Sequence, residues 1–385
     1  MNELVDAVII GGGIHGCAIA CSLAQKSRQK ILLLEKKYLA AGATGRCAAG
    51  IRQQFGTEIN IRLATASIKK FEQLQDELDY HRNVGLLQHG YLMLAYSQSE
   101  LKQYQENALL QKQIDANNQT SLLGVDEISE MVPQLNLKGV VGASYNPKDG
   151  HVDPFLATDA YATAARRRGV EIRTDTEVTD ILLQGERVCG VVTHKGEIIH
   201  TPVVVNAAGA FGSILGKKVG IDLPLYPERH QLLVSEPLEM FLGPTIISFF
   251  HGACFKQTPQ GSLILGVGDP QHEIKALNER SSWQFLGDVA RKLTYHMPLL
   301  ENISVIRQWA GLYDMTPDAQ GIVGETGIEG FYLDLGWSGH GFQLAPAIGQ
   351  IMAEIICGEK PFIDVRVLSL ERFARGELIP EPYCV

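Results

Sequence analysis

Three glycines and one acid near the start of the chain have the spacing of a dinucleotide-binding site. Gly11, Gly13 and Gly16 follow a mostly apolar run, and Glu35 follows a second one. In this motif the first glycine allows a tight turn, the second lets a pyrophosphate approach the backbone, and the third allows a helix to pack closely. Glu35 is placed to accept hydrogen bonds from the adenosine ribose and to repel a 2′-phosphate. The pattern predicts binding of FAD or NAD and leaves the choice between them open.

The elements that must position these residues are readable from the same segment. Residues 5–10 and 31–34 are apolar runs typical of buried strands, and residues 17–26 have a helical pattern. The order is strand, glycine turn, helix, strand and acid, which is the context that the motif needs. A helix N-terminus at the turn offers unpaired N–H groups to the phosphates. This context disfavours the alternative of a glycine-rich turn that binds nothing.

A second glycine-rich turn, at residues 336–342, favours FAD over NAD. It follows an apolar run at 331–335 and precedes a helical pattern at 345–356. The isoalloxazine ring of a flavin lies far from the ADP part and needs a cradle of its own, whereas a nicotinamide cofactor has no such need. A helix N-terminus at this turn stabilises the negative charge that a reduced flavin carries.

Length, charge and cysteine content narrow the class of protein. A chain of 385 residues predicts two domains. Its net charge of −9 argues against a nucleic-acid partner. No apolar run approaches the length of a membrane span, and the first strand begins too early for a signal peptide, so we expect a cytoplasmic protein. The seven cysteines form no C-x-x-C pair. We therefore expect no zinc site or other metal site and no disulfide framework.

The motifs together resemble one known family, the D-amino-acid oxidase-type (DAO) FAD-dependent oxidoreductases. Within that family the chain is most similar to the β subunits of heterotetrameric sarcosine oxidase and of dye-linked L-proline dehydrogenase. The resemblance extends from about residue 5 to residue 380. The segments that carry it are residues 11–16, 35–36, 45–46, 206–209, 307–309, 316–318 and 336–342, and the most specific are residues 52–56 and residues 338–342 with 345–346.

The resemblance implies an α/β fold of two domains, like that of glycine and sarcosine oxidases. A Rossmann-like FAD-binding domain would comprise residues 1–80, 141–220 and 301–385. A discontinuous mixed-sheet substrate domain would comprise residues 81–140 and 221–300. The implied reaction is oxidation of an amino acid or N-substituted amino acid of the sarcosine, proline, hydroxyproline or opine class. A hydride passes from the carbon beside nitrogen to flavin N5, and the resulting imine is hydrolysed.

The resemblance also assigns residues. Arg52 aligns with the position that holds the substrate carboxylate, and a structural ion pair is its alternative role. His340 either contacts the flavin or braces its loop, while Tyr313 and His251 would line the substrate pocket or serve only in packing. The expected catalytic set is Arg52, His340, Gln343, Tyr313 and His251. The expected cofactor-binding set is Gly11, Gly13, Ile14, His15, Gly16, Glu35, Lys36, Gly45, Arg46, Cys47, Val178, Ala208, Gly209, Gly311, Gly336, Gly339, His340, Gly341, Phe342 and Gln343.

Departures from the family pattern bear on the electron acceptor. Gln343 stands where single-chain sarcosine oxidases have a lysine that binds the carboxylate, and Ile264 stands where a lysine promotes reaction with oxygen. Loss of a cation near the flavin should slow oxygen reduction, which favours a dehydrogenase that passes electrons to an α-type subunit or another acceptor protein. Gly311 replaces the cysteine that tethers FAD, so non-covalent FAD is expected. An FMN at an interface with a partner subunit is a further expectation, although Pro154 lies near the position of the histidine that anchors it.

Three alternatives remain open at this point. The first is a self-sufficient glycine or sarcosine oxidase that produces hydrogen peroxide. The second is a non-catalytic FAD-binding subunit that supports a partner. The third is a nicotinamide-dependent dehydrogenase, which a yellow purified protein would exclude.

Overall fold

The two apolar runs of the glycine motif form the centre of a six-stranded sheet. Alternate residues of its strand β2 point to opposite faces: Ala7 and Ile9 pack among helices, while Val8 and Ile10 belong to a second core. Because both faces are covered, the strand is apolar throughout. The strands, in order across the sheet, are β19 (Ile322–Glu325), β20 (Phe331–Leu335), β13 (Val204–Asn206), β2 (Ala7–Ile10), β3 (Ile31–Leu34) and β9 (Glu171–Arg173). Neighbouring strands are parallel except for the pair β19 and β20.

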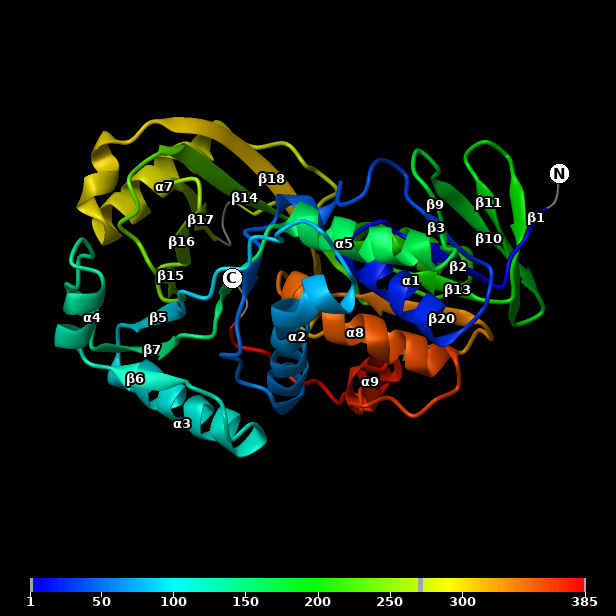
Figure 1. Ribbon diagram of the computed structural model, residues 1–385, viewed down its shortest axis with the longest axis horizontal. Helices are drawn as coiled ribbons and strands as arrows, with labels where there is room; N and C mark the ends of the chain where they lie inside the picture. Colours follow the sequence, from blue (N-terminus) through cyan, green and yellow to red (C-terminus); the bar gives the residue numbers. More distant parts are fainter. Residues whose placement is uncertain (1–2, 269–272, 384–385) are drawn as a thin grey trace.

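Helices cover one face of this sheet and a smaller sheet covers the other. The helices are α1 (Ile14–Lys26), α5 (Pro154–Arg167) and α8 (Gly341–Ile356), which lie side by side in Figure 1. The smaller sheet has the order β1 (Glu3–Leu4), β12 (Ile198–His200), β11 (Arg187–Thr193) and β10 (Val178–Gln184). The turn η2 (Gly209–Phe211) and helix α6 (Gly212–Lys218) follow β13. Together these elements form the cofactor lobe.

An eight-stranded mixed sheet forms the second lobe, on the left in Figure 1. Its order is β18 (Val305–Met315), β14 (Tyr226–Pro237), β17 (Ser262–Val267), β16 (Ala253–Gln257), β15 (Thr245–Ser248), β5 (Tyr91–Ala95), β7 (Gly142–Asn146) and β6 (Ser121–Leu123). All pairs are antiparallel except β15 with β5. The helical elements of this lobe are α3 (Gln98–Ile114), α4 (Val125–Met131), α7 (Trp283–His296) and η3 (Pro298–Asn302).

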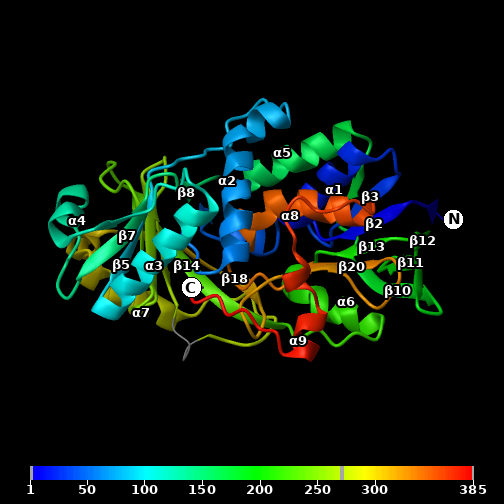
Figure 2. The ribbon, with the colours of Figure 1, turned by 90° about the horizontal axis from the view of Figure 1, so that it is seen from below.

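Several short elements and one long helix lie where the lobes meet. Helix α2 (Glu58–Glu77) stands between the lobes in both views (Figures 1 and 2). The remaining elements are η1 (Ala43–Arg46), the strand pair β4 (Gly50–Ile51) and β8 (Gly150–His151), η4 (Arg366–Leu368) and α9 (Glu371–Arg375). After α9 the chain returns to the junction of the lobes (Figure 2). The polypeptide therefore crosses between the lobes several times.

The computed structural model describes residues 3–268 and 273–383 and confirms the expected α/β fold of two lobes. The division differs from the expected one at two places: strands β7 and β18, which fall in the segments assigned to the cofactor domain, belong to the eight-stranded sheet. Backbone pairing explains this, because β18 pairs with β14 along ten positions and β7 pairs with β5 along five. Helix α8 also starts four residues before the expected residue 345, directly at the second glycine turn. Within the described ranges, no helix is long and apolar enough to cross a membrane.

Candidate active site

The first glycine turn has no space for side chains. Gly11 has a φ of +118°, and a Cβ atom there would lie 2.3 Å from the Ala207 carbonyl oxygen. A Cβ atom on Gly16 would lie 1.9 Å from the Gly11 carbonyl oxygen. Gly13 is the N-cap of α1 and has no side-chain cap, so the helix N-terminus faces the space beyond the turn. This is the cradle that a pyrophosphate requires.

Glu35 lies at the end of β3 and is connected to the same turn. Its Oε2 atom accepts a hydrogen bond from the Gly12 amide at 2.7 Å, and its Oε1 atom accepts one from the Lys37 amide at 2.8 Å. Two main-chain bonds fix the carboxylate where the ribose of an adenine dinucleotide is expected. Each carboxylate oxygen can accept more than one hydrogen bond, so this anchoring leaves capacity for ribose hydroxyls.

His15 connects the first glycine turn to the second. Its Nδ1 atom lies 2.8 Å from Asp334 Oδ2, and its Nε2 atom lies 2.9 Å from the Gly341 carbonyl oxygen. Both partners are acceptors, so both ring nitrogens donate, which requires the protonated imidazolium. Burial disfavours the charge, but the charge and hydrogen bond of Asp334 and the bond to Gly341 outweigh it and raise the pKa of His15. His15 is thus a fixed cation rather than a proton carrier.

We expect His15→Gln to destabilise the protein most at acidic pH. Because the pKa is raised in the folded state, the stabilisation by charged His15 is fully present below the ordinary histidine pKa and is lost as the pH rises through the raised value. A hydrogen bond to a charged group is worth about 1.5–3 kcal/mol, which sets the expected loss near pH 5. Urea unfolding of both proteins at several pH values measures it. A difference that grows with pH would contradict the assignment.

The segment after β3 forms hydrogen bonds with strand β18 of the eight-stranded sheet. Arg46 donates to the Ala41 carbonyl at 3.1 Å and to the Ala310 carbonyl of β18 at 2.8 Å. Trp309 Nε1 returns a bond to the Arg46 carbonyl at 2.9 Å. Gly311 lies against this arginine, since a Cβ atom there would lie 3.0 Å from Arg46 Cβ. Arg46 therefore holds the lobes together beside the cavity.

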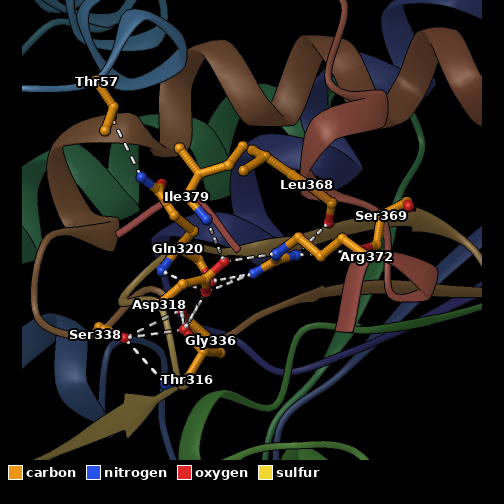
Figure 3. A network of polar contacts seen from close by, with 10 residues as sticks. All are labelled: Thr57, Thr316, Asp318, Gln320, Gly336, Ser338, Leu368, Ser369, Arg372 and Ile379. Atoms are coloured by element: carbon orange, nitrogen blue, oxygen red, sulfur yellow. Dashed lines mark hydrogen bonds and ion pairs between the residues drawn. The ribbon is translucent and has the colours of Figure 1, made fainter. Parts of the chain in front are cut away.

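The second glycine turn is held by a buried polar network, shown in Figure 3. Arg372 is fully buried, and its guanidinium donates to the two carboxylate oxygens of Asp318 at 2.9 and 3.0 Å. The neighbouring Thr316 amide donates to Ser338 Oγ at 3.1 Å, and Ser338 lies within the turn at a φ of +46°. Gly336 leaves the strand at a φ of +79°. The C-terminal segment thus braces the turn from which α8 begins.

One cavity runs from the first glycine turn to the second, beside the large sheet. At one end it is lined by Gly11, Gly13 and Glu35, and at the other by Trp337 and Gly341. The other expected residues that line it are Ile14, His15, Lys36, Arg46, Cys47, Val178, Ala208, Gly209, Gly311, Tyr313, Gly339 and Phe342. A cavity that reaches two helix N-termini fits an extended dinucleotide that carries a ring system at its far end.

Five residues of the expected cofactor-binding set lie outside this lining. Gly16, Gly45 and Gly336 allow close packing instead: a Cβ atom would lie within 2.5 Å of the Gly11 carbonyl, the Ala40 carbonyl and the Thr316 side chain, respectively. His340, the N-cap of α8, and Gln343, in the first turn of that helix, are buried. The Gln343 Oε1 atom accepts a hydrogen bond from the Arg52 amide at 2.8 Å.

The guanidinium of Arg52 has main-chain partners. Its guanidinium donates to the carbonyls of Gln54 and Tyr383 and lies 4.0 Å from the centroid of the Phe55 ring. His340 packs on the same ring, and its burial together with the charge of Arg52 lowers the pKa of His340 to about 3. The side chain of Arg52 is thus committed to main-chain carbonyls, and it is not among the residues that line the cavity. This favours the structural alternative over direct carboxylate binding.

The structure separates the other two substrate candidates. Tyr313 lines the cavity and stacks on His230, with the ring centroids 3.8 Å apart. His251 lies elsewhere, in an aromatic cluster with Tyr96 and His296, and is not among the cavity-lining residues. We therefore keep Tyr313 in the proposed site and leave His251 out.

Sequence reasoning missed residues that only the tertiary structure brings to the cavity. His230 and Asp334 line it, and Lys256 lies buried on β16, the strand that also carries the cavity-lining Cys254. The sequence offered one signal for Lys256, a lysine inside a segment typical of a strand. Alternate residues of a strand share a face, so this lysine would share a face with Cys254. Over residues 3–268 and 273–383, no cluster of histidine, cysteine or carboxylate side chains could hold a metal ion.

The fold and cavity define a two-domain flavoprotein oxidoreductase. Residues 6–355 match the family model described as FAD dependent oxidoreductase, the DAO family, and the chain belongs to this family. It is 30% identical to sarcosine oxidase subunit beta of Rhodobacter capsulatus over 98% of this chain and 90% of that protein.

Two solved structures are similar along almost the whole chain. L-proline dehydrogenase from P. horikoshii superposes with a TM-score of 0.92 at 36% identity and covers 98% of this chain and 100% of its own. Glycine oxidase from Geobacillus kaustophilus has a TM-score of 0.87 at 25% identity and covers 96% and 99%, respectively. The family, fold and cofactor class expected from the sequence are confirmed.

Proposed function

We propose that this chain is an FAD-dependent amino-acid oxidoreductase that acts on the CH–NH bond of a sarcosine-, proline-, hydroxyproline- or opine-type substrate. The observation that carries the proposal is full-length similarity to an L-proline dehydrogenase and a sarcosine oxidase subunit, combined with a cavity that reaches the substrate lobe. FAD supplies a two-electron acceptor for the hydride from the carbon beside nitrogen. The imine product is then hydrolysed.

The chain's own residues hold and orient the reactants. Gly13 and the α1 N-terminus would receive the pyrophosphate, and Glu35 the ribose. The α8 N-terminus and the His15 cation would face the flavin end, where negative charge develops. No covalent tether is proposed, because Gly311 offers no side chain. Similarity to an FAD dependent oxidoreductase family supports FAD alone, and it gives no support to an additional FMN.

Electrons pass, in this proposal, to a partner subunit or carrier protein. Ile264 and Gln343 supply no charge, and a relative that is one subunit of an oxidase supports an assembly with other chains. A cytoplasmic location stays a prediction from the sequence. One observation favours the alternative of a self-sufficient oxidase: Lys256 is the direct cross-strand partner of Ile264, so a cation stands next to the position where the family lysine is missing.

Oxygen consumption and dye reduction distinguish the two acceptors. We expect the purified chain to reduce an artificial dye with proline or N-methylglycine and to form hydrogen peroxide about a hundredfold more slowly, the usual scale for loss of one stabilising group. Rapid peroxide formation, at a rate equal to dye reduction, would contradict the dehydrogenase and support the oxidase.

A further inference from the structure

Lys256 is a buried lysine without a hydrogen-bond or ion-pair partner among the residues that the structure describes. The residue is 4% exposed. Among the described residues, none forms an ion pair or a hydrogen bond with its ammonium group. An uncompensated charge inside a protein costs several kcal/mol. A lysine kept in such a place indicates that its counter-charge arrives with a ligand.

The strand register places Lys256 on the cavity side of the sheet. Cys254 pairs with Gly266, and both line the cavity. Lys256 pairs with Ile264 one step further along the same two strands, and residues two apart share a face. The opposite face carries Phe255 and its neighbours, which pack into the core of the lobe. Lys256 therefore lies on the same face of the sheet as the cavity-lining Cys254, next to the cavity although not among its lining residues.

A second buried polar side chain, His151, feels the charge of this lysine. His151 on β8 is 7% exposed, and its Nε2 atom has no hydrogen-bond partner among the residues that the structure describes. Burial and the charge of Lys256 lower the pKa of His151 to about 3, so the imidazole is neutral at pH 7. Burial likewise lowers the pKa of Lys256 to about 8, which leaves it mostly charged at that pH. A cation beside a neutral hydrogen-bonding ring suits a carboxylate.

We propose that Lys256, with His151 beside it, receives the carboxylate of the substrate. This inference rests on the proposed function and replaces Arg52 in the role that the resemblance assigned to it. Arg52 already donates to two main-chain carbonyls, whereas no residue in the described ranges accepts a hydrogen bond from Lys256. A carboxylate held on the β16–β17 face would place the neighbouring CH–NH group toward the cavity.

The test uses unreactive carboxylates that cannot form an imine. Methoxyacetate and tetrahydrofuran-2-carboxylate carry oxygen where sarcosine and proline carry nitrogen, and their carboxamides lack the charge. Each is titrated into the FAD-loaded protein, and the visible flavin spectrum reports binding. We expect Lys256→Met to bind both carboxylates about 30-fold or more weakly, since truncating one partner of a buried charge pair has an effect of this size. Carboxamide affinity should change less than about threefold.

Two control variants and a thermal unfolding curve test whether a loss of carboxylate affinity comes from the charge of Lys256. Lys256→Arg should retain most of the carboxylate affinity, and Lys112→Met, which removes an exposed lysine on α3, should retain all of it. Without ligand, Lys256→Met should unfold at the same or a higher temperature than wild type, because removing an unpaired buried charge relieves its desolvation cost. A lower melting temperature would reveal an internal partner and overturn the inference.

The outcomes separate this inference from the proposed function. If proline or sarcosine reduces the flavin while Lys256→Met binds the carboxylates as tightly as wild type, the inference on Lys256 is wrong and the function stands. An Arg52→Met variant that alone loses carboxylate affinity would restore the original assignment. If the carboxylates bind through Lys256 but no amino acid reduces the flavin, the carboxylate site stands and amine oxidation is excluded.

Discussion

Replacing Gly13 by alanine should deprive the protein of FAD while leaving the fold intact. Gly13 has an ordinary extended conformation, with φ of −74° and ψ of 179°, so alanine is compatible with the backbone. The added Cβ atom would meet only Thr44 Oγ1, at 3.0 Å. It would, however, occupy the space into which the pyrophosphate must come. Overpacking of about 1–3 kcal/mol predicts FAD binding weaker by roughly 5- to 150-fold.

The measurement is the flavin content of the purified variant and its FAD dissociation constant, compared with urea unfolding of the apoprotein. Gly287→Ala is the matched control, since Gly287 lies in α7 with open space around it. The control should bind FAD normally and gain about 1 kcal/mol of stability. Normal FAD affinity in Gly13→Ala would contradict the proposed cradle, whereas a loss of apoprotein stability would show that the effect is on the fold.

Replacing Arg372 by methionine should destabilise the protein by about 3–5 kcal/mol, the usual range when one partner of a buried ion pair is removed. The change leaves the buried carboxylate of Asp318 without its ion-pair partner. It also removes one hydrogen bond of 2.9 Å from each of the carbonyls of Leu368 and Gln320, of which Gln320 still accepts from Thr316. Burial of Asp318 favours its neutral form, but the hydrogen bonds and charge of Arg372 lower the pKa of Asp318. The wild-type advantage is therefore complete above the ordinary aspartate pKa and is lost as the pH falls through the lowered value.

Urea unfolding of the apoprotein near neutral pH gives the size of this effect. The double variant Asp318→Asn with Arg372→Met removes the stranded charge and should recover part of the loss. Since the network braces the second glycine turn (Figure 3), the single variant should also retain FAD less well. A change of less than about 1 kcal/mol would mean that the C-terminal segment does not hold the turn.

The cofactor half of the site could be predicted because its signals are local. Gly11, Gly16 and Glu35 belong to one strand–turn–helix–strand unit, where each residue type follows from the backbone conformation beside it. The second glycine turn was readable for the same reason. The lobe boundaries were less accurate, because membership of β7 and β18 in the large sheet depends on pairing with strands distant in sequence.

The substrate half depends on contacts that no local pattern encodes. Arg52 donates to the carbonyl of Tyr383, 331 residues away, and this contact favours a structural role, one of the two roles expected for this residue. His251 was a candidate for the substrate pocket, yet the turn after β15 places it among aromatic residues and outside the cavity lining. Lys256 could not be recognised from the sequence. Only the structure shows that the lysine is buried and that none of the described residues forms an ion pair or a hydrogen bond with it.

Anaerobic mixing of the FAD-loaded chain with a panel of amino acids, imino acids and opines tests the central claim most directly. We predict that at least one compound of the proline or N-methylglycine class bleaches the visible absorbance of the oxidised flavin and yields the corresponding imine product. Dithionite serves as the control that the bound flavin is reducible. If dithionite bleaches the flavin and no member of the panel does, the chain is an FAD-binding subunit without amine-oxidising activity, and the proposed function is contradicted.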